Sequence, residues 1–107
     1  MNRILIISIL FVKIIFPDIA LSNNQKHIVH AGSMYYNPSF IEIITGDTIQ
    51  FVNEGGYHDV EVTEGPELLS LGACSGPCII GELVFNIPGD YEYICSIGSH
   101  ASQGMVG

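Results

Sequence analysis

The stretch that decides the fold is Tyr91-Glu-Tyr-Ile-Cys95, which follows Pro88-Gly-Asp90 and leads into Ser96-Ile-Gly-Ser-His-Ala-Ser-Gln-Gly-Met105. Pro-Gly-Asp is a turn signal, and the five residues after it have the aromatic and β-branched character of a strand. Side chains in a strand alternate between its two faces, so Tyr91, Tyr93 and Cys95 project to one side. We therefore expect a strand whose buried aromatic stripe ends in a thiol.

Upstream of this strand, short apolar and β-branched runs alternate with turn signals such as Thr45-Gly-Asp47 and Glu54-Gly-Gly56. The chain has no sustained helical period, no internal repeat and no low-complexity tract. Short, evenly spaced strands with Gly and Pro between them predict an all-β fold, a small Greek-key sandwich. The expected strands lie at residues 26–31, 40–44, 48–53, 59–63, 82–87 and 91–95.

Residues 64–81 show no clear period and are rich in Gly, Pro, Ser and Leu. We expect Leu68, Leu69 and Leu71 to form a short helical turn that caps the core. Alternation along the strands predicts a core drawn from Phe40, Ile43, Ile49, Phe51, Val60, Val62, Val84, Phe85, Tyr91 and Tyr93.

The first 22 of the 107 residues have the organisation of an export signal. Arg3 precedes an apolar run at residues 4–12, and Ala20-Leu-Ser22 offers small residues at the positions that a signal peptidase reads. Nine residues before Lys13 fall well short of the ~20 needed to span a bilayer. We therefore expect a signal peptide at 1–22 and one domain at 23–107, without stable membrane insertion after cleavage. The expected compartment is an oxidising one: the periplasm, with a thylakoid lumen as the alternative.

The charge balance is strongly acidic, with a formal net charge of −8 for the whole chain. Without residues 1–22, Lys26 is the only strong base against ten acidic residues. Such a chain would be repelled by nucleic acid and by anionic membranes. A partner with a basic docking surface would be attracted and its encounter speeded.

Cys95, His100 and Met105 follow one another at steps of five residues, and His58 supplies a second imidazole far upstream. A thiolate and imidazoles are strong copper ligands, and a thioether suits Cu(I). Two His, one Cys and a weak axial Met are the ligand set of blue-copper electron-transfer sites. The sequence thus predicts one type 1 copper ion, with Asp59 beside His58 as a polar residue that could hold the two ligand segments together.

Cys74 and Cys78 flank Ser-Gly-Pro, and Gly76-Pro77 could form a tight turn that brings the two thiols together. A disulfide between them would leave Cys95 as an unpaired thiol. Metal ligation would explain why an exported chain keeps one unpaired thiol. A zinc site of Cys74, Cys78 and Cys95 is the alternative on ligand type, but it leaves His58 unexplained.

With these residues the chain resembles the cupredoxin family, the small blue copper proteins such as plastocyanin, the azurins and the phytocyanins. The resemblance runs through residues 40–53, His58 and 88–95, and it ends in Gly104-Met-Val-Gly107. It implies the ligand set of His58, Cys95, His100 and Met105, and an exported carrier of single electrons rather than an enzyme. A copper-binding or copper-delivery protein that does not shuttle electrons is the alternative.

Three features depart from the family pattern. Four residues separate Cys95 from His100, where plastocyanins have two. Phytocyanins place a disulfide cysteine directly after the second His, where this chain has Ala101. Family members usually continue after the Met into a last strand, whereas this sequence stops at Gly107. We therefore expect that the sandwich lacks its final strand or that the sequence is truncated, with Met105 tethered on one side only.

Overall fold

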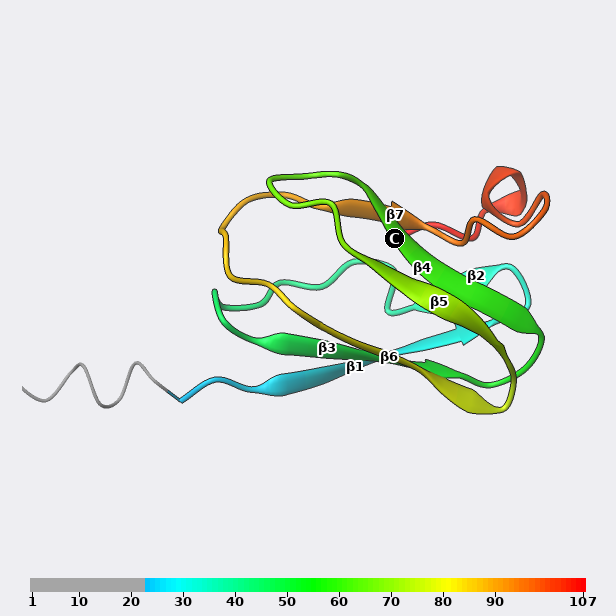
Figure 1. Cartoon of the computed structure of the whole chain (residues 1–107), viewed down its shortest axis with the longest axis horizontal. Coiled ribbons are helices and arrows are strands. Elements are labelled where there is room, and N and C mark those ends of the chain that lie inside the picture. The colour runs from blue at the N-terminus through cyan, green and yellow to red at the C-terminus, as the bar shows by residue number, and fades with distance from the viewer. Residues whose placement is uncertain (1–22) are drawn as a thin grey trace, which may run out of the picture.

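A computed structural model describes residues 23–107 as two β-sheets packed face to face (Figure 1). One sheet has four strands in the order β2-β1-β3-β6, and the other has three in the order β5-β4-β7. β1 and β3 are parallel, although every other strand pair is antiparallel. The expected signal peptide at 1–22 lies outside the described residues. Within 23–107, no helix is both long enough and apolar enough to span a bilayer.

The strand bounds agree with the sequence reading at both ends of the domain. The predicted strand at 48–53 is found with those bounds, and the strands expected at 26–31, 59–63 and 91–95 are each found within three residues. The elements are β1 (Lys26–Gly32), β2 (Tyr35–Asn37), β3 (Thr48–Asn53), β4 (Tyr57–Glu64), β5 (Ser70–Ser75), β6 (Cys78–Val84), β7 (Glu92–Ile94) and the 3-10 turn η3 (Ala101–Gln103).

Three predictions about the elements are wrong, and the first is the strand expected at 82–87, which begins earlier and ends at Val84. Residues 64–81 do not form a loop with a helical cap, because β5 and most of β6 lie there and pair with β4 and β3. Residues 40–44 do not form a strand, since no neighbouring strand pairs with them. The backbone of residues 40–43 makes no backbone–backbone hydrogen bond within the described part of the chain.

The core lies between the sheets and contains six of the predicted residues: Ile49, Phe51, Val60, Val62, Phe85 and Tyr93. Ile43 and Tyr91 are partly buried. Phe40 is 77% exposed because its segment stands at the edge of a groove, and Val84 is 46% exposed because Leu83 and Phe85 take the inward positions around it. The core also contains Cys95, which was expected at the end of the buried stripe, and residues that were not predicted there: Val29, Ala31, Tyr36, Leu83 and Met105.

An open apolar groove of about 1010 Å³ lies between residues 39–45 and β7. Its lining includes Phe40, Ile44, Ile87, Ile94 and Val106. Phe40 and Ile44 are mostly exposed there, at 77% and 71%.

Cys74 and Cys78 form a disulfide, as the sequence suggested. The bond joins the end of β5 to the start of β6 and thus links the two sheets. Closing so short a loop stabilises a fold by only about 2 kcal/mol in the chain-entropy account. The zinc alternative is wrong, because the two disulfide sulfurs are not free thiolates.

Candidate metal centre

Cys95 follows β7 directly and continues its alternation. Tyr93 and Cys95 both face inward and are buried, as the sequence predicted. The Tyr93 ring packs edge-on against Tyr36 and Phe51, with ring centroids 4.9 and 5.4 Å apart. The strand that carries the thiol is thus anchored in the core by a cluster of packed aromatic rings.

His58 is the second residue of β4, where the same alternation turns His58, Val60 and Val62 toward the core. The β3–β4 turn that precedes it contains Gly56, whose φ of 91° suits glycine. His58 is buried although it stands at the start of a strand, because both the turn and the loop after Cys95 cover it.

The loop from Ser96 to Gly104 brings His100 and Met105 back toward Cys95. The N–H of His100 donates to the carbonyl of Ile97, and the N–H of Met105 donates to the carbonyl of His100. Gly104, with a φ of 105°, ends η3 and reverses the chain. The Cys95 N–H then donates to the Met105 carbonyl at 3.1 Å, and Met105 is fully buried.

The expectation that Met105 is tethered on one side only is wrong. Residues beyond it pair with β7: Tyr93 and Gly107 exchange two backbone hydrogen bonds of 3.0 and 2.9 Å. An isolated antiparallel bridge joins Ile94 to Val106. The Met105 backbone is therefore held on both sides against the strand that carries Cys95.

The three strongest ligand candidates converge. The Cys95 Sγ lies 3.4 Å from Nδ1 of His100 and 3.8 Å from Nδ1 of His58, and one ligand atom of each residue lies within 4.8 Å of the others. A metal ion at zinc-like distances of about 2.3 Å from sulfur and about 2.0 Å from nitrogen, in a trigonal plane, would separate those atoms by about 3.7 Å. The side chains present therefore fit one such ion with little rearrangement.

Burial sets the protonation of this group. It is the main cause that lowers the pKa of His58, and the neighbouring His100 lowers it further. The imidazole of His58 is thus neutral at neutral pH and keeps a lone pair for a metal. Burial also raises the pKa of the Cys95 thiol, so a metal ion must displace the thiol proton on binding.

Asp59 joins the two segments that carry the ligands, in the position that the sequence suggested. Its Oδ1 accepts the backbone N–H of Ser96 at 2.7 Å, and its Oδ2 accepts the Ser96 hydroxyl. Asp59 follows His58 and Ser96 follows Cys95, so these bonds fix β4 against the start of the ligand loop. The Asp59 carbonyl also accepts the Tyr36 hydroxyl at 2.6 Å.

His27 and His30, both in β1, are not part of this group and pair with carboxylates instead. His27 Nε2 is 2.8 Å from Asp47 Oδ2, and His30 Nδ1 is 3.0 Å from Glu54 Oε2. Among residues 23–107, His58, Cys95 and His100 are the only group of His, Cys, Asp or Glu side chains arranged to hold a metal ion.

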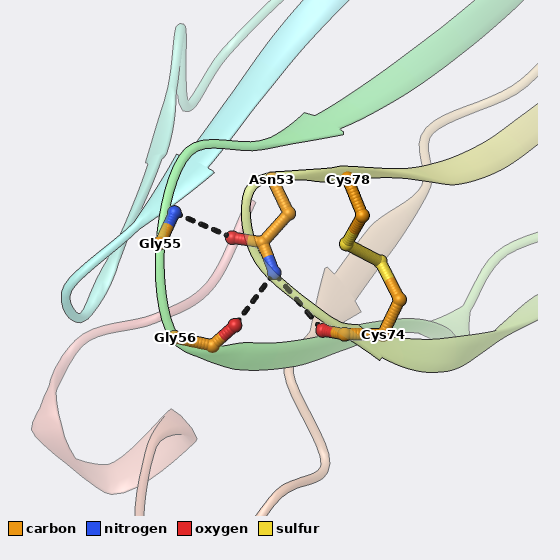
Figure 2. Close-up of a disulfide and its surroundings, with 5 residues drawn as sticks. All are labelled: Asn53, Gly55, Gly56, Cys74 and Cys78. Atoms are coloured by element: carbon orange, nitrogen blue, oxygen red, sulfur yellow. Dashed lines mark hydrogen bonds between the residues drawn. A yellow bond between two sulfur atoms is a disulfide. The ribbon is translucent and has the colours of Figure 1, made fainter.

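Asn53 is the residue near the centre that the sequence reading missed. It is fully buried, and its amide bonds the β3–β4 turn and Cys74 (Figure 2). Asn before Glu-Gly-Gly has the composition of an ordinary turn residue, although the alternation of Ile49 and Phe51 along β3 places Asn53 on the same buried face. A shallow hollow of about 430 Å³ lies at the solvent side of the centre and is lined by Met34, Tyr57, Ile97 and His100 among others.

Comparison with known families gives a match over all the described residues. The model of the copper binding proteins of the plastocyanin/azurin family matches residues 23–107. A protein of Rhizobium leguminosarum bv. viciae, by name a pseudoazurin, is 35% identical over 78 residues. That match covers 70% of this chain but only 49% of the relative, so the chain spans about half the relative's length.

Solved structures show the same fold. The amicyanin of Paracoccus versutus superposes with a TM-score of 0.62 at 24% identity, over 77% of this chain and 76% of amicyanin. A copper-containing nitrite reductase from Thermus scotoductus SA-01 gives a TM-score of 0.61 at 30% identity. This second match covers 77% of the chain but 21% of the reductase, so the likeness is to one part of that larger protein.

Proposed function

Because the chain belongs to the plastocyanin/azurin family of copper-binding proteins, we propose that it carries single electrons between redox partners through one type 1 copper ion. The observation that carries this proposal is the convergence of one buried thiol and two imidazole Nδ1 atoms at the end of the sandwich. The bound copper supplies the one-electron couple, and the chain supplies a fixed set of donors.

Each donor has a distinct part in the proposal. Cys95 would provide the thiolate, and His58 and His100 would each provide a neutral imidazole Nδ1. Met105 would contribute a weak thioether donor that tunes the reduction potential. The full burial of Met105 and its backbone bond to Cys95 support this last assignment.

The carrier is proposed to act outside the cytoplasm, with residues 1–22 as its export signal and 23–107 as the mature domain. The periplasm is the compartment we favour. Half-buried His100, at the rim of the shallow hollow, would be the point where electrons enter and leave. The acidic charge of the chain favours partners with a basic docking surface, such as a cytochrome or a copper enzyme.

A carrier is favoured over an enzyme because the likeness to the nitrite reductase is confined to 21% of that protein. Residues 23–107 offer one group of metal-binding side chains and no second one for a substrate-binding metal. The mass of the exported protein would test cleavage after Ser22, and an assay for nitrite reduction by the copper-loaded protein would test the enzymatic alternative.

The decisive experiment is to load the purified protein with Cu(II) and record its visible and electron paramagnetic resonance spectra. We expect a strong thiolate-to-copper band that bleaches reversibly on reduction and is absent in Cys95→Ser. His27→Ala is the matched control, because His27 pairs with Asp47 away from the centre and the band should persist. Copper binding without that band, or rapid copper loss on reduction, would favour delivery of copper over electron transfer.

A further inference from the structure

Asn53 uses all of its side-chain groups to hold the turn between β3 and β4. Its Nδ2 donates to the carbonyls of Gly56 at 2.8 Å and Cys74 at 3.0 Å, and its Oδ1 accepts the N–H of Gly55 at 3.0 Å (Figure 2). Asn53 is fully buried, so each lost bond would leave a buried polar group without a partner. One side chain therefore connects the turn before β4 to the end of β5.

The β5–β6 turn is fastened to the same place. The N–H of Gly76 donates to the carbonyl of Gly56 at 2.8 Å. A Cβ at Gly76 would lie 2.7 Å from the backbone nitrogen of Gly55, so the two turns are in direct backbone contact. The Cys74–Cys78 disulfide closes the β5–β6 turn around Gly76 and thereby fixes both the Cys74 carbonyl and the Gly76 N–H.

The two turns are connected to His58 by a side-chain contact and by strand pairing. A Cβ at Gly56 would lie 2.6 Å from Nε2 of His58, so the turn packs against the imidazole on the side away from Nδ1. His58 is also the residue paired with Cys74 between β4 and β5, as Asn53 is paired with Cys78 between β3 and β6. Both ends of the disulfide thus stand opposite residues of the His58 turn.

His58 has particular need of such support, since it is the one candidate ligand outside the segment 95–105. The hydrogen bonds from Ser96 to Asp59 hold the adjacent residue, and not the His58 side chain itself, against the loop after Cys95. The turn lies close against Nε2 and leaves the ring little room to move on that side. Because the disulfide closes a short loop, it lowers the entropy of the unfolded chain only slightly. Its contribution to overall stability is therefore modest.

We propose that Asn53 and the Cys74–Cys78 disulfide are positioning residues for the copper site. They hold the β3–β4 turn against the His58 imidazole and so keep Nδ1 directed toward Cys95 Sγ. The inference rests on the proposed function, because it assigns His58 as a copper ligand. Partners that orient a metal ligand typically change metal affinity by about 10- to 100-fold when removed.

The test compares Asn53→Ala and the double variant Cys74→Ser/Cys78→Ser with Ile49→Ala. Ile49 is a buried residue of the same strand as Asn53, but it lies at the other end of β3 and faces the apolar groove. For each protein we would measure urea unfolding, Cu(I) affinity by competition with a chromophoric chelator, and the Cu(II) electron paramagnetic resonance spectrum. Imidazole nitrogen NMR of the metal-free protein would report the tautomer and mobility of His58.

We call Asn53→Ala and Cys74→Ser/Cys78→Ser the clamp variants. Both should lose about 10- to 100-fold in Cu(I) affinity and show altered electron paramagnetic resonance parameters. Their His58 ring signals should broaden or shift without metal. Ile49→Ala should unfold at lower urea but keep its Cu(I) affinity within about twofold, as expected of a distant, independent site. Combining both clamp changes should lower affinity little beyond the larger single effect, because the two act through the same turn.

Clamp variants that lose stability yet retain the wild-type affinity, spectrum and His58 signals would overturn the inference. So would an affinity that falls equally in Ile49→Ala, since that result would assign the effect to general stability. Wild-type protein that gives no copper–thiolate spectrum would instead refute the proposed function. In that case the NMR of metal-free Asn53→Ala would still decide whether the turn positions the ring, even if the serine variant failed to fold.

Discussion

Gly56 shows how closely a single residue can limit the copper site. Its φ of 91° lies in the left-handed region, and the position of its missing side chain is occupied by the His58 ring. An L-residue there is strained by its backbone and also collides with a candidate ligand. The adjacent Gly55 has neither constraint, because a Cβ there would meet no atom within 4 Å.

We therefore predict that Gly56→Ala lowers Cu(I) affinity by about tenfold or more, the scale seen when groups that orient a ligand are disturbed. Chelator competition would measure the change, with Gly55→Ala as the matched control. Equal affinities for the two variants would show that the ring can move away from Gly56 without consequence.

Asp59 provides a second test at the level of one side chain. Asp59→Ala removes both bonds to Ser96 and should lower the free energy of unfolding of the metal-free protein by about 1.5–3 kcal/mol, typical of hydrogen bonds to a charged group. Asp59→Asn keeps an acceptor for the Ser96 N–H and should lose less. Urea unfolding would compare the two, and a larger loss in the asparagine variant would contradict this role.

Among the elements, β1 is unusual because it pairs in parallel with β3 and is joined to it by no hairpin. Its start is instead held by Asp47, whose carboxylate accepts the N–H groups of Gln25 at 2.9 Å and Ile44 at 3.1 Å. The bond to His27, followed by that from Gln25, lowers the pKa of Asp47 below its ordinary value. The carboxylate thus ties the first strand to the turn before β3.

This shift has a definite sign. A carboxyl whose pKa is lower in the folded state contributes its full stabilisation above the unfolded pKa of about 4 and loses it as the pH falls below that value. Wild-type protein should therefore lose more unfolding free energy between pH 7 and pH 3 than Asp47→Asn does. Urea midpoints at both pH values would measure this, with the exposed Glu42→Gln as the control that should follow the wild type.

The strands and the ligands differ in how well the sequence could predict them. His58, Cys95, His100 and Met105 could be found because their chemistry and spacing are visible in the residues themselves. The strands at 70–75 and 78–84 could not, since Gly, Ser and Cys obscure their alternation and only their pairing with β4 and β3 defines them. Residues 40–44 show the reverse case, because their sequence has a clear strand pattern but no neighbouring strand pairs with them.

Asn53 marks the limit of this kind of prediction at the site. Its role depends on Cys74, more than 20 residues away in sequence, and on a turn in which Gly56 takes a positive φ. No local pattern carries that information. Asp59 could be suggested because it adjoins a ligand, but its partner Ser96 becomes evident only when β4 and β7 are side by side.

The whole molecule is a strongly anionic body with little internal compensation. Lys26, the one Lys or Arg among residues 23–107, already pairs with Glu82 at 2.7 Å. On the other sheet, Glu64 and Glu92 stand opposite each other between β4 and β7, and no ion pair within the described range involves either. Like charges at such positions repel, so this face keeps a negative potential available to partners.

Electron exchange should therefore depend on the charge of the partner and on salt. We expect oxidation of the reduced protein by a cationic cobalt(III) complex to slow as salt shortens the screening length from about 30 Å to about 10 Å. Oxidation by hexacyanoferrate(III) should accelerate over the same range. Stopped-flow kinetics would measure the oxidation rate with each oxidant. The double variant Glu64→Gln/Glu92→Gln should weaken both salt dependences if this face contributes. The same salt response for the two oxidants would exclude electrostatic steering.

The apolar groove beside β7 has a practical consequence for anyone who handles the protein. Within the described part of the chain, the backbone of residues 40–43 makes no backbone–backbone hydrogen bond, and it lies along this groove with the exposed side chains of Phe40 and Ile44. Surfaces of this kind are templates on which further chains add and form insoluble assemblies. Shelf life will thus be governed by protein concentration and ionic strength, with net negative charge as the colloidal barrier that salt removes.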